Sequence, residues 1–215
     1  MKFIKRLVLV LFVLFILAFV GAMVAASRIH AEVLSSDLPQ DVYESDGDLE
    51  ALALIKLVRI FNPLSTEDDY TLFEEFLNLM ILSVIHSELN ASYDPLSENM
   101  DNATQYIYYN DYIMIDKLYA KVTEEDQIEV VVAFENHTIF NIDSKISLFF
   151  DVEISTLPTP QVVLSLDKTY LSDIEITKDT LDWILSYFDK TSIEDSVPFG
   201  ELDLTEYTYT VSPTL

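Results

Sequence analysis

The chain has 215 residues, a formal net charge of −25 and no cysteine. All 37 acidic residues lie within residues 29–215 beside only eight basic ones, which gives this region a formal charge of −29. Nucleic-acid binding requires Lys and Arg to neutralise phosphates, so we expect no nucleic-acid partner. The hydrophobic fraction of 50% is too high for an acidic disordered chain, and we therefore expect one folded domain.

An apolar run without any charged side chain begins at Leu7 and ends at Ala26. A helix of this length rises about 30 Å, which is the hydrocarbon thickness of a bilayer. Three basic residues within residues 1–6 precede the run, and such clusters stay on the cytoplasmic side. We therefore predict a single-pass anchor in the cell membrane, with residues 1–6 cytoplasmic and the rest of the chain extracytoplasmic.

A cleaved secretory signal peptide is the alternative interpretation of this stretch. Signal peptides also begin with positive charge, and Val24 and Ala26 ahead of Ser27 could form a cleavage site. Their apolar cores usually contain about 7–15 residues, fewer than this run, so its length favours the anchor. A lipoprotein is excluded because no cysteine is present to be acylated, and a disulfide-free extracytoplasmic domain favours a bacterial source.

Residues 27–47 form a connector rich in serine and acidic residues, which ends at an Asp-Gly turn. Residues 48–215 then form the predicted extracytoplasmic domain, which begins with a helix. Apolar residues at helical spacing predict this helix from Leu49 to Phe61, where the following Asn-Pro pair ends it.

The second predicted helix has the sequence pattern of a capping box. Thr71 is the expected N-cap residue, Glu74 is expected to reach back to it, and the helix runs to about Leu89. Residues 79–82 are apolar on every side of this helix. We therefore expect this part to be buried or covered by a partner.

From Thr104 the pattern changes from helical to alternating, which predicts strands with one dry and one wet face. The expected strands are residues 106–109, 112–122, 128–135, 145–154, 162–166 and 174–176. The dry face of such a sheet needs a cover, which the helices can supply. The predicted fold is α+β: an N-terminal transmembrane helix followed by a twisted antiparallel sheet covered on one face by helices.

The carboxyl-terminal part contains one more helix and one irregular strand. Thr177 is the expected N-cap of an amphipathic helix that contains Leu181, with Ile176 as its hydrophobic staple. Farther along, Leu202 and Tyr209 have opposite parity in the alternating pattern. We therefore predict a bulge near residues 205–206 that returns both apolar sets to one face.

Several kinds of chemistry lack their sequence signals. The chain has three glycines, and none lies in a phosphate-binding loop or a nucleophile elbow. Its three histidines have no metal-ligand spacing, and its acidic clusters are more typical of turns and solvated faces than of calcium sites. Trp183 is expected to pack in or at the rim of the core. We therefore predict that the protein is not an enzyme and uses no cofactor and no metal.

The order of elements resembles that of the YpmS-like family of uncharacterised, membrane-anchored bacterial proteins. The resemblance covers nearly the whole chain and rests on the single anchor, the helical segment of residues 74–78 (EEFLN), the alternating strands and residues 174–177 (IEIT) before the last helix. In that family a Glu-Leu-Asn helix precedes the strands; here Phe76 interrupts that pattern, and Glu175 stands where proline is expected. The resemblance implies an extracytoplasmic α+β domain and transfers no catalytic residue.

Two functional interpretations follow. The first is a binding module for an apolar ligand such as a lipid, with the candidate lining residues Leu79, Met80, Leu148 and Phe150. The second is a structural or interaction protein that docks onto another cell-envelope protein, with the candidate surface Tyr106, Tyr108, Tyr207 and Tyr209. A cavity between sheet and helices would favour the ligand, and a filled core with an exposed tyrosine patch would favour docking.

Overall fold

The structure is a computed structural model that describes residues 33, 38–45, 47–62, 64–97, 101–136, 142–155, 160–186 and 200–212. The predicted anchor, residues 7–26, lies outside these ranges. Within them, none of the helices is both long and apolar enough to cross a membrane.

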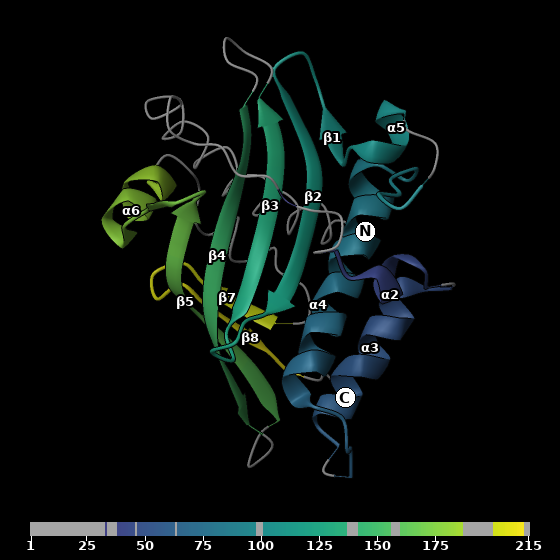
Figure 1. Cartoon of the computed structure of the whole chain (residues 1–215). Helices are drawn as coiled ribbons and strands as arrows, with labels where there is room; N and C mark the ends of the chain where they lie inside the picture. Colours follow the sequence, from purple (N-terminus) through teal and green to yellow (C-terminus); the bar gives the residue numbers. More distant parts are fainter. Residues whose placement is uncertain are drawn as a thin grey trace.

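An antiparallel sheet forms the body of the fold. Its strands lie side by side in the order β1 (Tyr108–Tyr109), β2 (Ile113–Val122), β3 (Ile128–Asn136), β4 (Ile142–Ser155), β5 (Gln161–Leu171), β8 (Thr208–Val211) and β7 (Gly200–Asp203). The short strand β6 (Ile174–Glu175) pairs with β5. The sheet curls into a half-barrel, so that β7 and β8 lie behind the long strands (Figure 1). The predicted α+β class and antiparallel sheet are confirmed.

Two helices lie along the β2 side of the half-barrel. Helix α4 (Asp69–Val84) runs next to β2 and continues into a π-helical turn, Ile85–Leu89. Helix α3 (Leu49–Ile60) packs against α4 on the side away from the sheet (Figure 1). The other helices within the described residues are short: α2 (Gln40–Tyr43), α5 (Asn102–Gln105) and α6 (Lys178–Leu185).

The inner face of the curled sheet and the helices enclose one large hydrophobic cluster. The predicted dry faces of β2 to β5 supply its strand side, because alternate residues of a strand point to the same face. Residues 79–82 of α4 are all buried in it, as expected for a helix segment that is apolar on every side. The rings of Phe73 and Phe76 stack within this cluster with centroids 5.7 Å apart.

The start of α4 differs from the predicted capping box. The N-cap residue is Asp68, whose carboxylate accepts hydrogen bonds from the backbone N–H and the hydroxyl of Thr71 at 2.8 and 2.9 Å. Thr71 therefore lies in the first turn of the helix. Asp is at least as good an N-cap residue as Thr, and the earlier acceptor extends the helix by three residues. Glu74 is thereby left free to bond elsewhere.

The outer face of the sheet is not uniformly wet. Tyr119, Val131 and Ala133 are buried there in a second hydrophobic cluster. Val33 and Leu38, from the expected connector, complete this cluster, and the Lys117 ammonium donates a hydrogen bond to the Val33 carbonyl. The prediction that this face of β2 and β3 is solvated is thus wrong at these positions, because a segment distant in the sequence covers them.

The predicted bulge near residues 205–206 is also wrong. The chain reverses there in a hairpin, and β7 and β8 pair with Leu202 opposite Tyr209. The carboxylate of Asp203 accepts hydrogen bonds from the N–H groups of two turn residues, Thr205 and Glu206. Opposite partners in an antiparallel pair share a face, so the reversal explains the change of parity without an extra residue.

The edge of β2 beyond β1 is satisfied by side chains of α4. The Asn78 amide donates to the Ala120 carbonyl at 2.7 Å and accepts from the Ala120 N–H at 2.8 Å. One helical turn earlier, Glu74 Oε2 accepts from the Val122 N–H at 2.6 Å. Residues i and i+4 of a helix are about 6 Å apart along its axis, close to the about 6.7 Å between residues i and i+2 of a strand. Helix α4 therefore takes the place that a further strand would occupy.

We predict that Asn78→Ala lowers the free energy of unfolding by about 3 kcal/mol, because it leaves a buried N–H and a buried C=O of Ala120 without partners. Urea unfolding of the full chain in detergent micelles, followed by circular dichroism, measures the change. Ser87→Ala, at an exposed position on the same helical segment, is the control and should change stability by less than about 0.5 kcal/mol.

Glu74 generates a second prediction, which concerns pH. Burial raises the pKa of its carboxyl above the ordinary value of 4.5, although the hydrogen bond from Val122 opposes the shift. The folded state then binds the proton more tightly than the unfolded state, so this group lowers stability as the pH rises above 4.5. Glu74→Gln keeps an acceptor for Val122 but cannot ionise. Its unfolding free energy should fall less between pH 4.5 and 7 than that of the natural chain; parallel pH profiles would contradict this assignment.

Candidate functional site

The four candidate lining residues of an apolar ligand site all lie in the main hydrophobic cluster. Leu79 and Leu148 are only 3% and 4% exposed, and Met80 is also buried. Phe150 is partly buried and packs against the same cluster. An acyl chain would need a cavity in the core. Side chains that line such a cavity are accessible to a molecule of the size of water. The near-complete burial of Leu79, Met80 and Leu148 is typical of packed core residues.

The four candidate tyrosines of a docking surface do not form one exposed patch. Tyr207 is 7% exposed and belongs to the main cluster, where its hydroxyl donates to Asp182 Oδ1 at 3.0 Å. Burial, and next the hydrogen bond to Asp182, raise the pKa of Tyr207, and burial likewise raises that of Tyr209. Both belong to the β7–β8 hairpin, at the opposite end of the strand order from β1.

Tyr106 and Tyr108 have different surroundings at the β1 end of the sheet. Tyr106 is partly buried, and its hydroxyl donates to Glu135 Oε1 at 3.5 Å. Burial, followed by the negative charge of Glu135, raises the pKa of Tyr106. Tyr108 is exposed on edge strand β1, beside two further exposed tyrosines that the candidate set omitted, Tyr109 and Tyr112.

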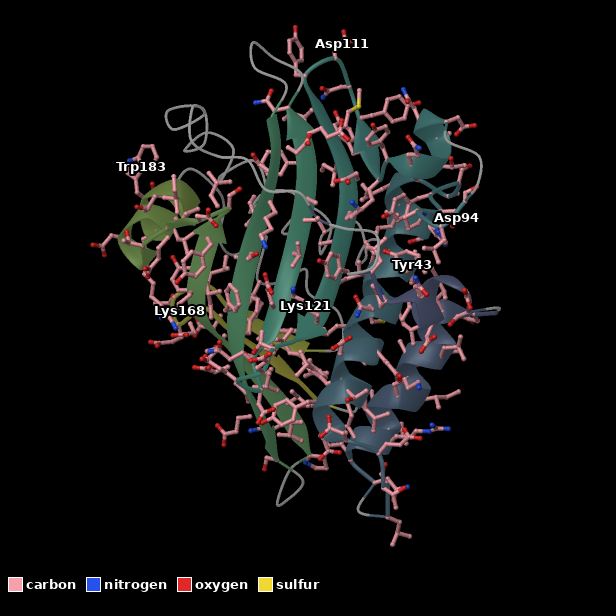
Figure 2. The ribbon with its side chains drawn as sticks, in the orientation of Figure 1. Tyr43, Asp94, Asp111, Lys121, Lys168 and Trp183 are labelled. Carbon is pink, nitrogen blue, oxygen red and sulfur yellow. The ribbon has the colours of Figure 1, made fainter. Side chains whose placement is uncertain are left out.

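We call Tyr108, Tyr109 and Tyr112 the tyrosine tip; their exposed fractions are 37%, 49% and 65%. They lie on β1 and on the turn into β2, which is the end of the molecule marked by Asp111 in Figure 2. Asn110 organises this turn, because its side chain accepts from the N–H of Tyr112 at 2.8 Å and donates to the Tyr108 hydroxyl at 3.0 Å. The sequence shows three tyrosines around an Asn-Asp pair, but only the structure shows that all three side chains are exposed.

Other residues that carry chemistry have structural roles. His86 is a partly buried residue of the π-helical turn, and its Nε2 lies 2.9 Å from the Tyr93 carbonyl oxygen. The acidic residues 67–69 and 124–126 lie at the start of α4 and in the β2–β3 turn, as expected. Among the described residues, no group of three His, Asp or Glu side chains could hold a metal. Trp183 is exposed on α6 (Figure 2) and is therefore not a core residue.

A second missed surface lies on α3. The expected apolar positions of this helix include its buried residues Ala53, Leu57 and Ile60. The helix is also apolar on the side away from α4, where Leu54, Ile55 and Val58 are exposed. The signal was present in the sequence, since Glu50, Lys56 and Arg59 are the only charged residues among residues 49–60.

We predict that Leu148→Ala lowers the free energy of unfolding by about 2–5 kcal/mol, as expected for a cavity created in a packed core. Leu54→Ala, at an exposed position, should change it by less than about 0.5 kcal/mol. Chemical denaturation of both variants in the full chain gives the comparison. A loss below about 1 kcal/mol for Leu148→Ala would instead indicate an open space at this wall.

Comparison of the chain with protein-family models, with curated proteins and with solved structures found no match. The resemblance to the YpmS-like family therefore stays a prediction.

Proposed function

We propose that the protein is a non-catalytic interaction module of the cell envelope. The apolar run from Leu7 to Ala26 holds it in the membrane, and the tyrosine tip docks onto another envelope protein on the extracytoplasmic side. The observation that carries this proposal is the exposure of three neighbouring tyrosines on edge strand β1 and the turn into β2, whereas the candidate lining residues of a ligand site pack in or against the core cluster. Tyrosine is enriched in protein interfaces because its ring is apolar and its hydroxyl can bond to water or to a partner.

The turn geometry supports a recognition role for the tip. The hydrogen bonds of Asn110 hold the backbone of the turn and the Tyr108 hydroxyl, and the rings of Tyr106 and Tyr109 lie 6.4 Å apart. Side chains that are ordered before binding lose less conformational entropy when a partner covers them. These contacts order Tyr108 and Tyr109 before a partner binds, which favours docking at this strand edge.

The charge of the region indicates the chemistry of the partner. Asp111 lies exposed in the turn of the tip, and Glu135, Asp116 and Asp143 all contribute to the raised pKa of the neighbouring Tyr106. With a formal charge of −29 over residues 29–215, the domain as a whole attracts cations. A partner surface rich in Lys and Arg would be complementary in charge, and binding should weaken as salt screens the attraction.

Site-specific photo-crosslinking in the membrane of the native cell tests the proposal. A photoreactive phenylalanine at Tyr112 should give one discrete protein adduct, whereas the same group at exposed Lys168 on β5 should not. Tyr109→Ala should reduce the Tyr112 adduct about tenfold, as expected for the loss of an aromatic anchor, and Tyr109→Phe should largely retain it.

Absence of a protein adduct at Tyr112, or equal adducts at both positions, would contradict docking through the tip. Native mass spectrometry of the full chain then distinguishes the ligand interpretation. Lipid retained at a fixed stoichiometry, together with no adduct at Tyr112, would favour a module that binds an apolar ligand.

A further inference from the structure

Helix α3 has an exposed apolar side in addition to its buried one. We call Ala51, Leu54, Ile55 and Val58 the α3 stripe; their spacing of i, i+3, i+4 and i+7 places them on one face of the helix. Leu54, Ile55 and Val58 are 41%, 49% and 60% exposed, and Leu64 in the following loop is 85% exposed. Because α4 packs against the opposite side of α3, nothing in the described part of the chain covers the stripe (Figure 1).

We propose that the α3 stripe rests on the lipid surface of the membrane that holds the anchor, with its aliphatic side chains inserted at the level of the head groups. This inference rests on the membrane anchoring in the proposed function. It adds a second contact with the bilayer, so that the domain has one preferred orientation relative to the membrane.

The length of the chain before the domain supports a lipid surface as the occupant. Six residues, 27–32, separate the end of the apolar run at Ala26 from Val33. Even fully extended, this segment spans at most about 25 Å. Val33 is itself held to the body of the domain by its burial against Tyr119 and by the hydrogen bond from Lys117. An anchored domain is therefore confined to the neighbourhood of the bilayer.

The size of the stripe also favours lipid over a second copy of the chain. A stable protein interface buries about 800 Å² on each partner, which a few half-exposed aliphatic side chains do not provide. An interfacial helix needs only to insert about 5–10 Å into the head-group region. The anchor supplies a high effective concentration, so a weak contact suffices to keep the stripe on the membrane.

The charges on α3 fit contact through apolar side chains. The stripe contains no acidic residue, although the domain is strongly acidic as a whole. The two basic residues of α3 are already paired, Lys56 with Glu75 and Arg59 with Glu67. Insertion should therefore depend on apolar burial, with little dependence on salt, and should be stronger in zwitterionic than in anionic bilayers.

Because the chain has no cysteine, single cysteines can carry an environment-sensitive fluorophore. We would attach the label to Val58→Cys on the stripe and, in a second variant, to Lys168→Cys on β5, which lies across the molecule from α3 in Figure 2. Each labelled full chain is reconstituted into phosphatidylcholine vesicles. Brominated lipid should quench the Val58 label at least about twofold and leave the Lys168 label almost unchanged. Ile55→Asp should abolish this quenching, whereas Ile174→Asp, at an exposed position on β6, should not.

Each other outcome overturns the inference. Equal quenching at both positions would show that the stripe has no preference for lipid. Quenching that depends on the protein-to-lipid ratio but not on bromine would identify a second copy as the occupant. If the chain floats with the vesicles but the Val58 label is not quenched, the stripe proposal fails and the anchor remains. If the chain does not float with the vesicles, both the stripe proposal and the membrane anchoring of the proposed function are overturned. Circular dichroism of each variant verifies that it is folded.

Discussion

The fold depends on the way in which α4 meets the edge of β2. The N–H and C=O groups at a strand edge need partners once they are buried, and an amide side chain offers both a donor and an acceptor. Asn78 satisfies both groups of Ala120, and Glu74 satisfies the N–H of Val122. The helix is thereby held in register along the strand, and its apolar segment, residues 79–82, is buried in the main hydrophobic cluster.

This arrangement determines which surfaces remain outside. Helix α4 lies between the sheet and α3, so α3 packs against α4 on one side, and the apolar side chains of Leu54, Ile55 and Val58 on its other side are exposed in the described part of the chain. At the opposite end of β2 the short strand β1 covers only residues 114 and 115, so the tyrosine tip lies on an edge. The exposure of the tyrosine tip and of the α3 stripe thus follows in both cases from the elements that lie beside β2.

Much of the local structure could be predicted because its signals are local. Helix α3 and the strands β2 to β4 lie within three residues of the predicted ranges, since apolar periodicity follows directly from the geometry of each element. Strand β5 begins within one residue of the prediction but ends at Leu171, five residues beyond the predicted range. The predicted N-cap residue of α4, Thr71, was wrong because Asp68 and Thr71 are both residue types that cap helices well. The candidate residues were found only in part: Leu79 and Leu148 are buried as their pattern requires, but the sequence could not show that Tyr207 is buried while Tyr112 is exposed.

By itself, the sequence determined the acidic character of the domain, its α+β class, the alternating faces of its strands and an apolar run of bilayer length near its start. The tertiary structure alone decided that Asn78 bonds to a strand 42 residues away, that Val33 and Leu38 cover Tyr119 on the outer face, and that β7 and β8 form a hairpin. The physical reason is the distance along the chain over which each kind of interaction acts. Periodicity and turn signals act over a few residues, whereas strand pairing and burial depend on partners that are distant in the chain.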